Sequence, residues 1–153
     1  MTTQHQKAED IAKLIEARMQ QITLAGGYET DIGTRVLRGA RKVDDSWVPC
    51  SVLIEGNDDP VQGESLKSPV AKIKQSYVLG GYTQCDPQNP NDAAHKIIRD
   101  LKRAMFADGA TLGGKVAKIE YKGRDIGPRT DGVAIVFAII EVVVTYVENL
   151  SEP

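Results

Sequence analysis

The sequence has few of the residue types that carry reactive chemistry or stack on nucleic-acid bases. Its 153 residues include two cysteines, two histidines and one tryptophan, and aromatic residues make up 5% of the chain. This scarcity of aromatic side chains argues against a stacking platform for single-stranded nucleic acid. Two cysteines are too few for a disulfide scaffold, and they favour a reducing compartment.

The chain also lacks an excess of charge of one sign and a long apolar run. It has 19 Lys and Arg against 21 Asp and Glu, whereas binding to DNA phosphates needs a basic surface. We therefore expect no sequence-specific nucleic-acid binding. The longest apolar stretch, Val133–Val147, is interrupted by Glu141 and is too short for a membrane-spanning helix. The first residues lack the pattern of a signal peptide, so we expect a cytosolic protein without membrane contact.

What the chain does have is the composition of a single globular domain. Hydrophobic residues make up 41% and charged residues 26%, which is ordinary for a folded soluble protein. A domain of this size buries about 70% of the surface that its unfolded chain would expose, so its folding requires neither a metal nor a disulfide. We expect one domain over residues 1–153, with frayed ends at 1–5 and 149–153, and no cofactor.

Two segments have the apolar spacing of amphipathic helices. The first spacing predicts a helix near residues 6–24 that ends at Gly26-Gly27, because glycine accepts the left-handed conformation of a helix end. The second predicts a helix that is capped by Asn91 or Asp92 and ends near Asp108-Gly109. The apolar positions are Ile11, Leu14, Ile15, Met19 and Ile22 in the first helix and Ala94, Ile97, Ile98, Leu101, Ala104 and Met105 in the second.

Five segments have the residue pattern of β-strands. Residues 133–147 are nearly all apolar, which predicts a central strand buried on both faces. Residues 55–69 are the least regular and predict a long hairpin tip, and residues 123–132 predict a turn. The result is an α+β fold in the order α-β-β-β-α-β-β, with a mostly antiparallel sheet and both helices on one face. The strands are expected at residues 34–38, 47–54, 70–82, 115–122 and 133–147.

The residues with reactive side chains do not form a recognisable chemical motif. Cys85 and His95 could approach each other, but a third metal ligand is not evident, and a nucleophilic pair is no better supported. Cys50 belongs to an apolar strand face, where a buried and inert thiol is expected. Gly113-Gly114 lacks the rest of a phosphate-binding loop, so a turn that enters a strand is the better interpretation.

Charged clusters are the better candidates for function. Arg35 and Arg38, with Arg41 and Lys42, could meet an acidic surface, and the predicted hairpin supplies acids at Asp58, Asp59 and Glu64. A charge inside the apolar strand at Glu141 either pairs with an arginine or is exposed at an edge, an interface or a channel, because an unpaired buried charge costs several kcal/mol. A solvated surface remains the alternative for each cluster. We expect the oligomer or partner interface to include Arg35, Arg38, Asp58, Asp59, Glu64 and Glu141.

Several short motifs follow one another in a recognisable order. They are the leading amphipathic helix, Arg35–Gly39, Pro49–Gly56 with the long hairpin after it, the basic second helix with Asp108–Gly114, Ile119–Tyr121 and the final strand Ala134–Tyr146. Over most of the chain this order resembles the tail-terminator family (tail-completion, minor tail protein U-like) of long-tailed bacteriophages and prophages. The Thr-Leu-Gly-Gly turn at Thr111–Gly114 is its most distinctive motif.

This resemblance implies a structural role with no catalytic residues. Such proteins are expected to form a hexameric ring on the head-proximal end of the tail tube, stop tube polymerisation and give the head-tail connector a docking surface. The implied partners are further copies of the chain, the tail tube protein and the connector protein. DNA passes through the ring without being bound. The implied location is the virion tail, and the host cytoplasm during assembly.

Two other classes of protein remain open. One is another head-tail joining or tail tube component, which would share the mixed composition. The other is a small ligand-binding domain or enzyme, which would need a deep pocket with convergent polar groups. We expect no enzyme, because the sequence offers no catalytic triad, no paired carboxylates in one motif and no metal-ligand spacing.

Overall fold

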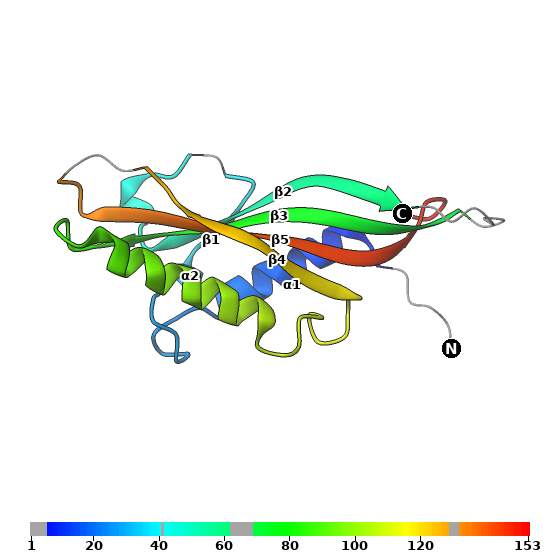
Figure 1. Ribbon diagram of the computed structural model, residues 1–153, viewed down its shortest axis with the longest axis horizontal. Coiled ribbons are helices and arrows are strands. Elements are labelled where there is room, and N and C mark those ends of the chain that lie inside the picture. The colour runs from blue at the N-terminus through cyan, green and yellow to red at the C-terminus, as the bar shows by residue number, and fades with distance from the viewer. Residues whose placement is uncertain (1–5, 41, 62–68, 129–131) are drawn as a thin grey trace.

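A sheet with both helices on one face organises the chain in the computed structural model (Figure 1). The structure describes residues 6–40, 42–61, 69–128 and 132–153. Within these residues the element order confirms the expected α+β fold. The elements are α1 (Ala8–Gln20), β1 (Val36–Arg38), β2 (Cys50–Val61), β3 (Val70–Gln84), α2 (Pro90–Phe106), β4 (Lys118–Ile126) and β5 (Ile135–Asn149), with short 3-10 turns at Ile32–Thr34 and Asp45–Trp47.

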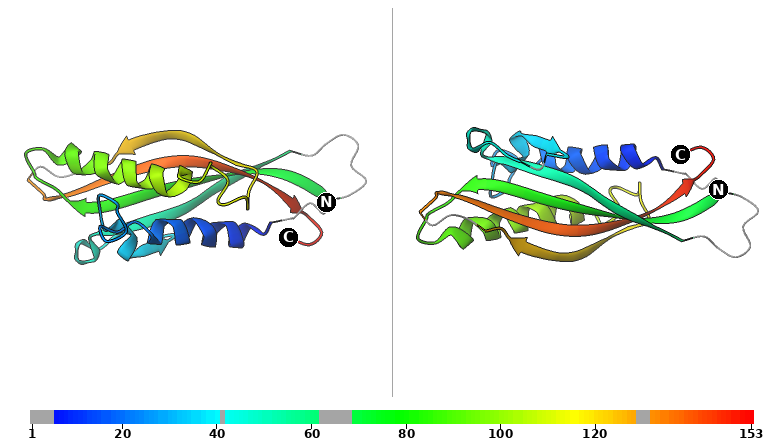
Figure 2. Two further views of the ribbon diagram at one scale, coloured as in Figure 1. Left: turned by 90° about the horizontal axis from the view of Figure 1, so that it is seen from below. Right: turned by 90° about the horizontal axis from the view of Figure 1, so that it is seen from above.

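The strands lie in the order β1-β2-β3-β5-β4. Strand β1 is parallel to β2, and all other neighbours are antiparallel. Seen from below, both helices lie in front of the sheet, with α1 toward β2 and α2 toward β4 (Figure 2). In agreement with this view, α1 contacts β1 and β2, while α2 contacts β3, β5 and β4.

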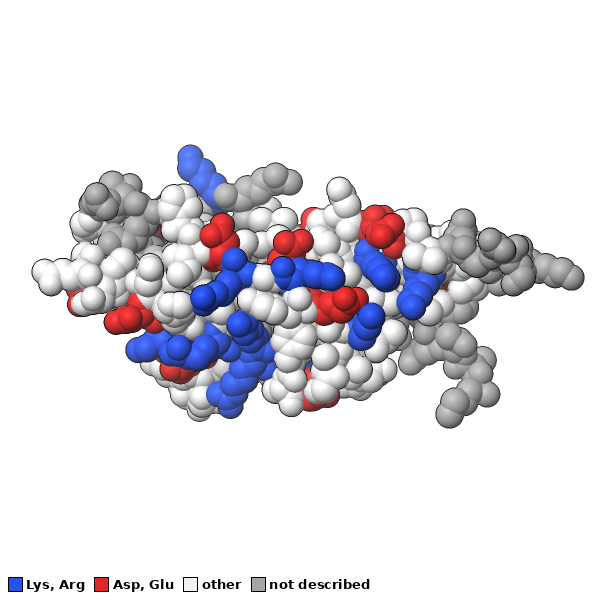
Figure 3. All heavy atoms as spheres, viewed as in Figure 1, with Lys and Arg blue, Asp and Glu red and all other residues white. Residues whose placement is uncertain are grey.

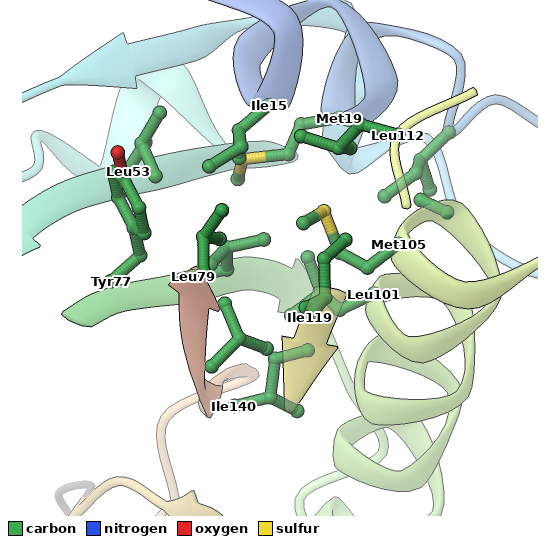
Figure 4. Packing of buried hydrophobic residues seen from close by; sticks show 14 of the residues in the cluster. Ile15, Met19, Leu53, Tyr77, Leu79, Leu101, Met105, Leu112, Ile119 and Ile140 are labelled. Carbon is green, nitrogen blue, oxygen red and sulfur yellow. The ribbon is translucent and has the colours of Figure 1, made fainter. Parts of the chain in front are cut away.

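The core lies between the helices and the sheet, where the apolar stripes of the two layers meet. Figure 4 shows Ile15 and Met19 of α1 pointing toward Leu79 of β3 and Ile140 of β5, with Leu101 of α2 beside them. All five side chains are fully buried. Removing one such side chain from water contributes about 1.5–3 kcal/mol to folding, so the core depends on the register that keeps these strand residues on the helix side.

The prediction that the last strand is buried on both faces is wrong. Burial alternates along β5: Val142 and Val144 are buried, whereas Val143 is half-buried and Glu141 is exposed. The reason is that the helices cover only one face of the sheet, and successive side chains of a strand point to opposite faces. The continuous apolar run therefore reflects one buried face and one that no helix covers.

Several predicted boundaries also need correction. Strand β2 continues to Val61 through a register shift between Glu55 and Asp58, so the expected irregular tip is partly strand. Pro60 fits there because a proline is tolerated where its missing N–H faces an open edge. Strand β4 runs to Ile126 and so includes the first four residues of the expected turn, Gly123 among them. The cap of α2 is Asn89 rather than Asn91 or Asp92, since Pro90 occupies the first turn.

Buried and half-buried polar contacts fasten the loop after α1 to α2. The Asp100 carboxylate, 2% exposed, accepts hydrogen bonds from the Glu29 amide at 3.0 Å and the Thr30 hydroxyl at 2.7 Å. From the neighbouring position of α2, on the surface, the Arg99 guanidinium donates two hydrogen bonds to Glu29, at 2.7 and 3.0 Å. This paired arrangement fixes the loop against the helix.

The turn after α2 is stabilised by a buried side chain and by an ion pair with α1. Ala110 and Leu112 have φ values of 61° and 49°, which non-glycine residues rarely adopt. Burial accounts for the second of these, since Leu112 is 2% exposed within the core cluster. Arg18 of α1 donates to Asp108 at the start of the turn and joins it to the first helix. The most distinctive motif of the sequence is thus part of the packing between the two helices.

Substitution of Gly33 by alanine tests how tightly the turn before β1 packs against the end of α1. A Cβ at this position would lie 2.3 Å from the Met19 carbonyl oxygen and 2.7 Å from that of Ile22. We expect Gly33→Ala to lower the free energy of unfolding by about 3 kcal/mol, because backbone atoms cannot move aside cheaply. The control Gly39→Ala, with φ of 76° and open space around it, should cost about 1 kcal/mol. Equal effects in urea unfolding would contradict the packing.

The ion pair between α1 and the turn predicts a pH-dependent part of stability. Hydrogen bonding from Arg18 lowers the pKa of Asp108 below its ordinary value. A lowered folded-state pKa gives stability that is complete above the ordinary carboxyl value near 4 and is lost as pH falls through the folded value. The difference in unfolding free energy between the wild type and Arg18→Gln should therefore shrink between pH 7 and pH 2.

An exposed pair on the same helix provides the control for this measurement. Lys13 lies 4.0 Å from Glu9 on the surface of α1, and such pairs contribute little. Lys13→Gln should differ little from the wild type at either pH. A difference for Arg18→Gln that stays constant from neutral to acid pH would show that the Asp108 carboxylate does not contribute.

Candidate assembly surfaces

The residues considered for chemistry make structural contacts or are buried. His95 Nδ1 lies 3.0 Å from Arg124 Nη1, and because a guanidinium can only donate, the imidazole accepts at this nitrogen. The Cys85 Sγ lies 4.0 Å from the Val133 carbonyl oxygen, and its amide donates to the Ala134 carbonyl oxygen at 2.9 Å. Burial raises the pKa of the Cys50 thiol, which keeps it protonated. Within the described residues no group of three or more His, Cys, Asp or Glu could hold a metal ion.

The glycine pair after α2 forms a turn that enters a strand, as the sequence predicted. The amides of Gly114, Lys115 and Val116 all donate to the Thr111 carbonyl oxygen, at 3.0 to 3.1 Å. These N–H groups are used within the turn, and the next element is β4 rather than a helix. The arrangement therefore lacks the helix start at which anions bind.

Two tyrosines, Tyr77 of β3 and Tyr146 of β5, are buried in the core. Burial raises the pKa of Tyr146 to about 12, and the Glu148 and Asp58 carboxylates add to the shift. Burial likewise raises the pKa of Tyr77 well above its usual range. Both hydroxyls stay protonated at neutral pH, so they are core side chains rather than nucleophiles.

The sheet face opposite the helices, here called the bare face, carries apolar side chains at its centre. The Phe137 ring stacks on Tyr82 with centroids 4.3 Å apart. It also lies over Gly80 and Gly127, where an added Cβ would approach the ring to 2.6 Å. Ile139 and Val143 continue this row along β5 and are half-buried. Part of the bare face is therefore apolar, and no helix of the described residues lies over it.

A shallow groove of about 420 Å³ crosses the bare face between β2 and β4. Its floor includes Ser76 and Val143, and its walls carry charges of both signs. On β4, Glu120 lies between Lys118 and Lys122, at 3.2 Å from each. Such an open, charged groove differs from the enclosed apolar pocket that typically binds a small molecule.

Glu141 is exposed on the bare face of the sheet. Its ladder neighbours are Val78 of β3 and Gly123 of β4, and neither brings an opposite charge. Gly123 lies in the register shift of β4, beside the carboxylate. Within the described residues no ion pair includes Glu141. The charge stands in the middle of the sheet and not at an edge.

The two arginines of the predicted interface lie at the β1 edge and have partners in their own chain. The Arg35 guanidinium lies 5.9 Å from the centre of the Trp47 ring, and Arg38 Nε lies 3.9 Å from Glu16 Oε2. Both remain partly exposed. Lys42 lines a shallow groove beside Trp47, and Arg41 lies outside the described residues.

The predicted acids lie farther along the same side of the sheet. Asp58 and Asp59 are exposed on β2, beyond the register shift and beyond the three residues that pair with β1. Glu64 lies outside the described residues. The structure thus separates the acids from Arg35 and Arg38, which lie next to the beginning of β2.

A basic surface along α2 and β4 was not singled out as a candidate from the sequence. Figure 3 shows lysine and arginine side chains gathered over these two elements. The Lys102 ammonium lies 4.5 Å above the Tyr121 ring, and Arg124 contacts His95, so the helix and the strand share these charges. The basic residues on the outer side of α2 can be recognised in the sequence. That they lie beside the basic residues of β4 is known only from the topology of the sheet. The surface comprises Lys96, Arg99, Lys102, Arg103, Lys118, Lys122 and Arg124.

Comparisons with known proteins give no family for the chain. A scan against protein-family models finds none that matches, and a search of curated proteins finds no match. Among the described residues, no helix has the length and apolar character needed to cross a membrane.

Substitution of Glu141 tests whether its carboxylate on the bare face contributes to stability through a charged partner. We expect Glu141→Gln to change the free energy of unfolding by less than about 0.5 kcal/mol, as at other exposed sites. The matched variant Asp100→Asn removes the charge from a buried carboxylate with several donors and should cost about 2 kcal/mol. A loss of about 3–5 kcal/mol for Glu141→Gln in urea unfolding would mean that a buried pair is broken.

Proposed function

We propose that the protein is a structural subunit of a long-tailed bacteriophage or prophage tail, where copies join into a ring. The ring caps the head-proximal end of the tail tube, stops its polymerisation and provides the surface on which the head docks. In this role the surfaces of the domain, rather than a reactive group, carry the function.

One observation carries this proposal: the sheet has two open edges that differ from each other. The outer half of β2 forms one edge and β4 forms the other. Open edges present unpaired backbone groups that favour pairing with another chain. Unlike edges on one molecule suit a heterologous contact, in which one patch meets a different patch on the next copy, and such contacts generate rings when the rotation closes.

The α+β architecture supports the same proposal. Its element order and its long β2–β3 hairpin agree with the order on which the sequence resemblance rests. The charged and open groove on the bare face supports contact with a protein surface more than binding of a small molecule.

The proposed function is tested by measuring the size and shape of the assemblies that the protein forms, alone and with the tail tube protein. The purified protein should form closed six-fold rings in negative-stain images, either alone at high concentration or with the tail tube protein of the same phage. Tubes assembled in its presence should be shorter and capped at one end. Open-ended tubes made of this protein would identify a tube component instead, and a protein that stays monomeric and leaves tube length unchanged would contradict the proposal.

A further inference from the structure

The first of the two open edges is acidic. Strand β1 pairs only with Ser51–Leu53 of β2. Beyond that point, no strand among the described residues lies on the outer side of β2. Its segment from Glu55 to Val61 contains three exposed acids and no base. Lys74 faces Asp59 across the β2–β3 ladder, on the side away from the edge. We call this segment, with Glu55, Asp58 and Asp59, the acidic edge.

The second open edge is basic. In the part of the chain that the structure describes, β5 is the one strand that pairs with β4. On its other side the Ile119 amide donates to the Ala110 carbonyl oxygen at 2.8 Å, which leaves the stretch from Tyr121 to Ile126 open. Lys122 and Arg124 are exposed on this stretch together with one acid, Asp125. Lys122 also pairs with Glu120 at 3.2 Å. Lys102 of α2 lies 4.5 Å above the Tyr121 ring, so that bases outnumber acids along this edge. We call this stretch, with Lys102, Lys122 and Arg124, the basic edge.

These edges select the way in which two copies can meet. Two acidic edges repel each other, as do two basic edges, since like charges brought together cost several kcal/mol. The contact between unlike edges brings opposite charges together and aligns two strands that both have unpaired backbone groups. It also leaves one acidic and one basic edge free at the ends of any open chain of copies, so that addition can continue until a ring closes.

We propose that the acidic edge of one copy docks on the basic edge of the next copy and that this head-to-tail contact builds the ring. The inference rests on the proposed function, for which it names the subunit contact. A symmetric pairing of two β2 edges, with Arg38 of one copy near the acids of the other, is less favoured. Such a pairing also brings the two acidic edges toward each other, where like charges repel.

Charge reversal tests the contact because substitutions can reverse the sign of the charge on either edge. An acid-reversed variant, Asp58→Lys with Asp59→Lys, has two basic edges, and a base-reversed variant, Lys122→Glu with Arg124→Glu, has two acidic edges. We expect each variant alone to need a protein concentration more than about tenfold higher than the wild type for half-maximal ring formation. An equimolar mixture should form rings again, since the two variants can alternate. The four-fold variant should form rings by itself.

Controls separate this effect from unfolding and from net charge. Circular dichroism and thermal unfolding confirm that each variant is folded, which matters for Arg124 because of its contact with His95. Glu9→Lys with Glu152→Lys, and Lys13→Glu with Lys115→Glu, make the same changes in net charge at exposed positions away from both edges. Both control variants should assemble as the wild type does. Assembly is read by light scattering and negative-stain imaging under the conditions in which wild-type rings form.

The outcomes distinguish the interface from the function. If the wild type forms rings and either reversed variant forms them equally well, the proposed contact is wrong and the proposed function stands. If the folded variants fail singly and their mixture also fails, the contact is wrong as well. A symmetric β2 contact would make the acid-reversed variant fail while the base-reversed variant assembles normally, which overturns the proposal. A wild type that never forms rings, even with the tube protein, overturns the proposed function itself.

Discussion

The structure depends on the packing of one face of a twisted sheet against two helices. Alternate residues of β3 and β5, such as Leu79 and Ile140, are buried under α1 and α2. A shift of either strand by one residue would bring their polar and half-buried neighbours into this core. Because the helices are confined to one face, the register that builds the core also determines what remains available to partners, namely the bare face and the two strand edges.

The surface features follow from this arrangement. Phe137 and Tyr82 stack on the bare face, opposite the two described helices, and Glu141 lies in the same row of β5. The short strand β1 covers only the beginning of β2, which leaves the acidic half of that strand open. At the opposite edge, α2 and β4 combine their basic side chains through the contacts of Lys102 with Tyr121 and of Arg124 with His95. The domain thus has chemically different ends for contact with copies of itself.

The sequence was sufficient for the fold class because periodicity is a local property. Ile11, Ile15 and Met19 could be assigned to one helix face without knowing their partners. Burial of β5 on both faces could not be rejected from the sequence, since an apolar run does not say whether helices cover one side or two. The extension of β2 past Glu55 depends on β3 as its pairing partner, and no local pattern reports it. The basic edge was missed for a similar reason: Lys102 and Lys122 are 20 positions apart, and only the topology joins them.

Amide hydrogen exchange before and after assembly tests the central claim most directly, since it reports which backbone groups become protected without altering any side chain. Assembly through unlike edges predicts that peptides from Glu55–Val61 and from Tyr121–Ile126 gain protection together, while the core strand β3 changes little. Protection that appears at only one of these two edges, or only on α1, would contradict the account.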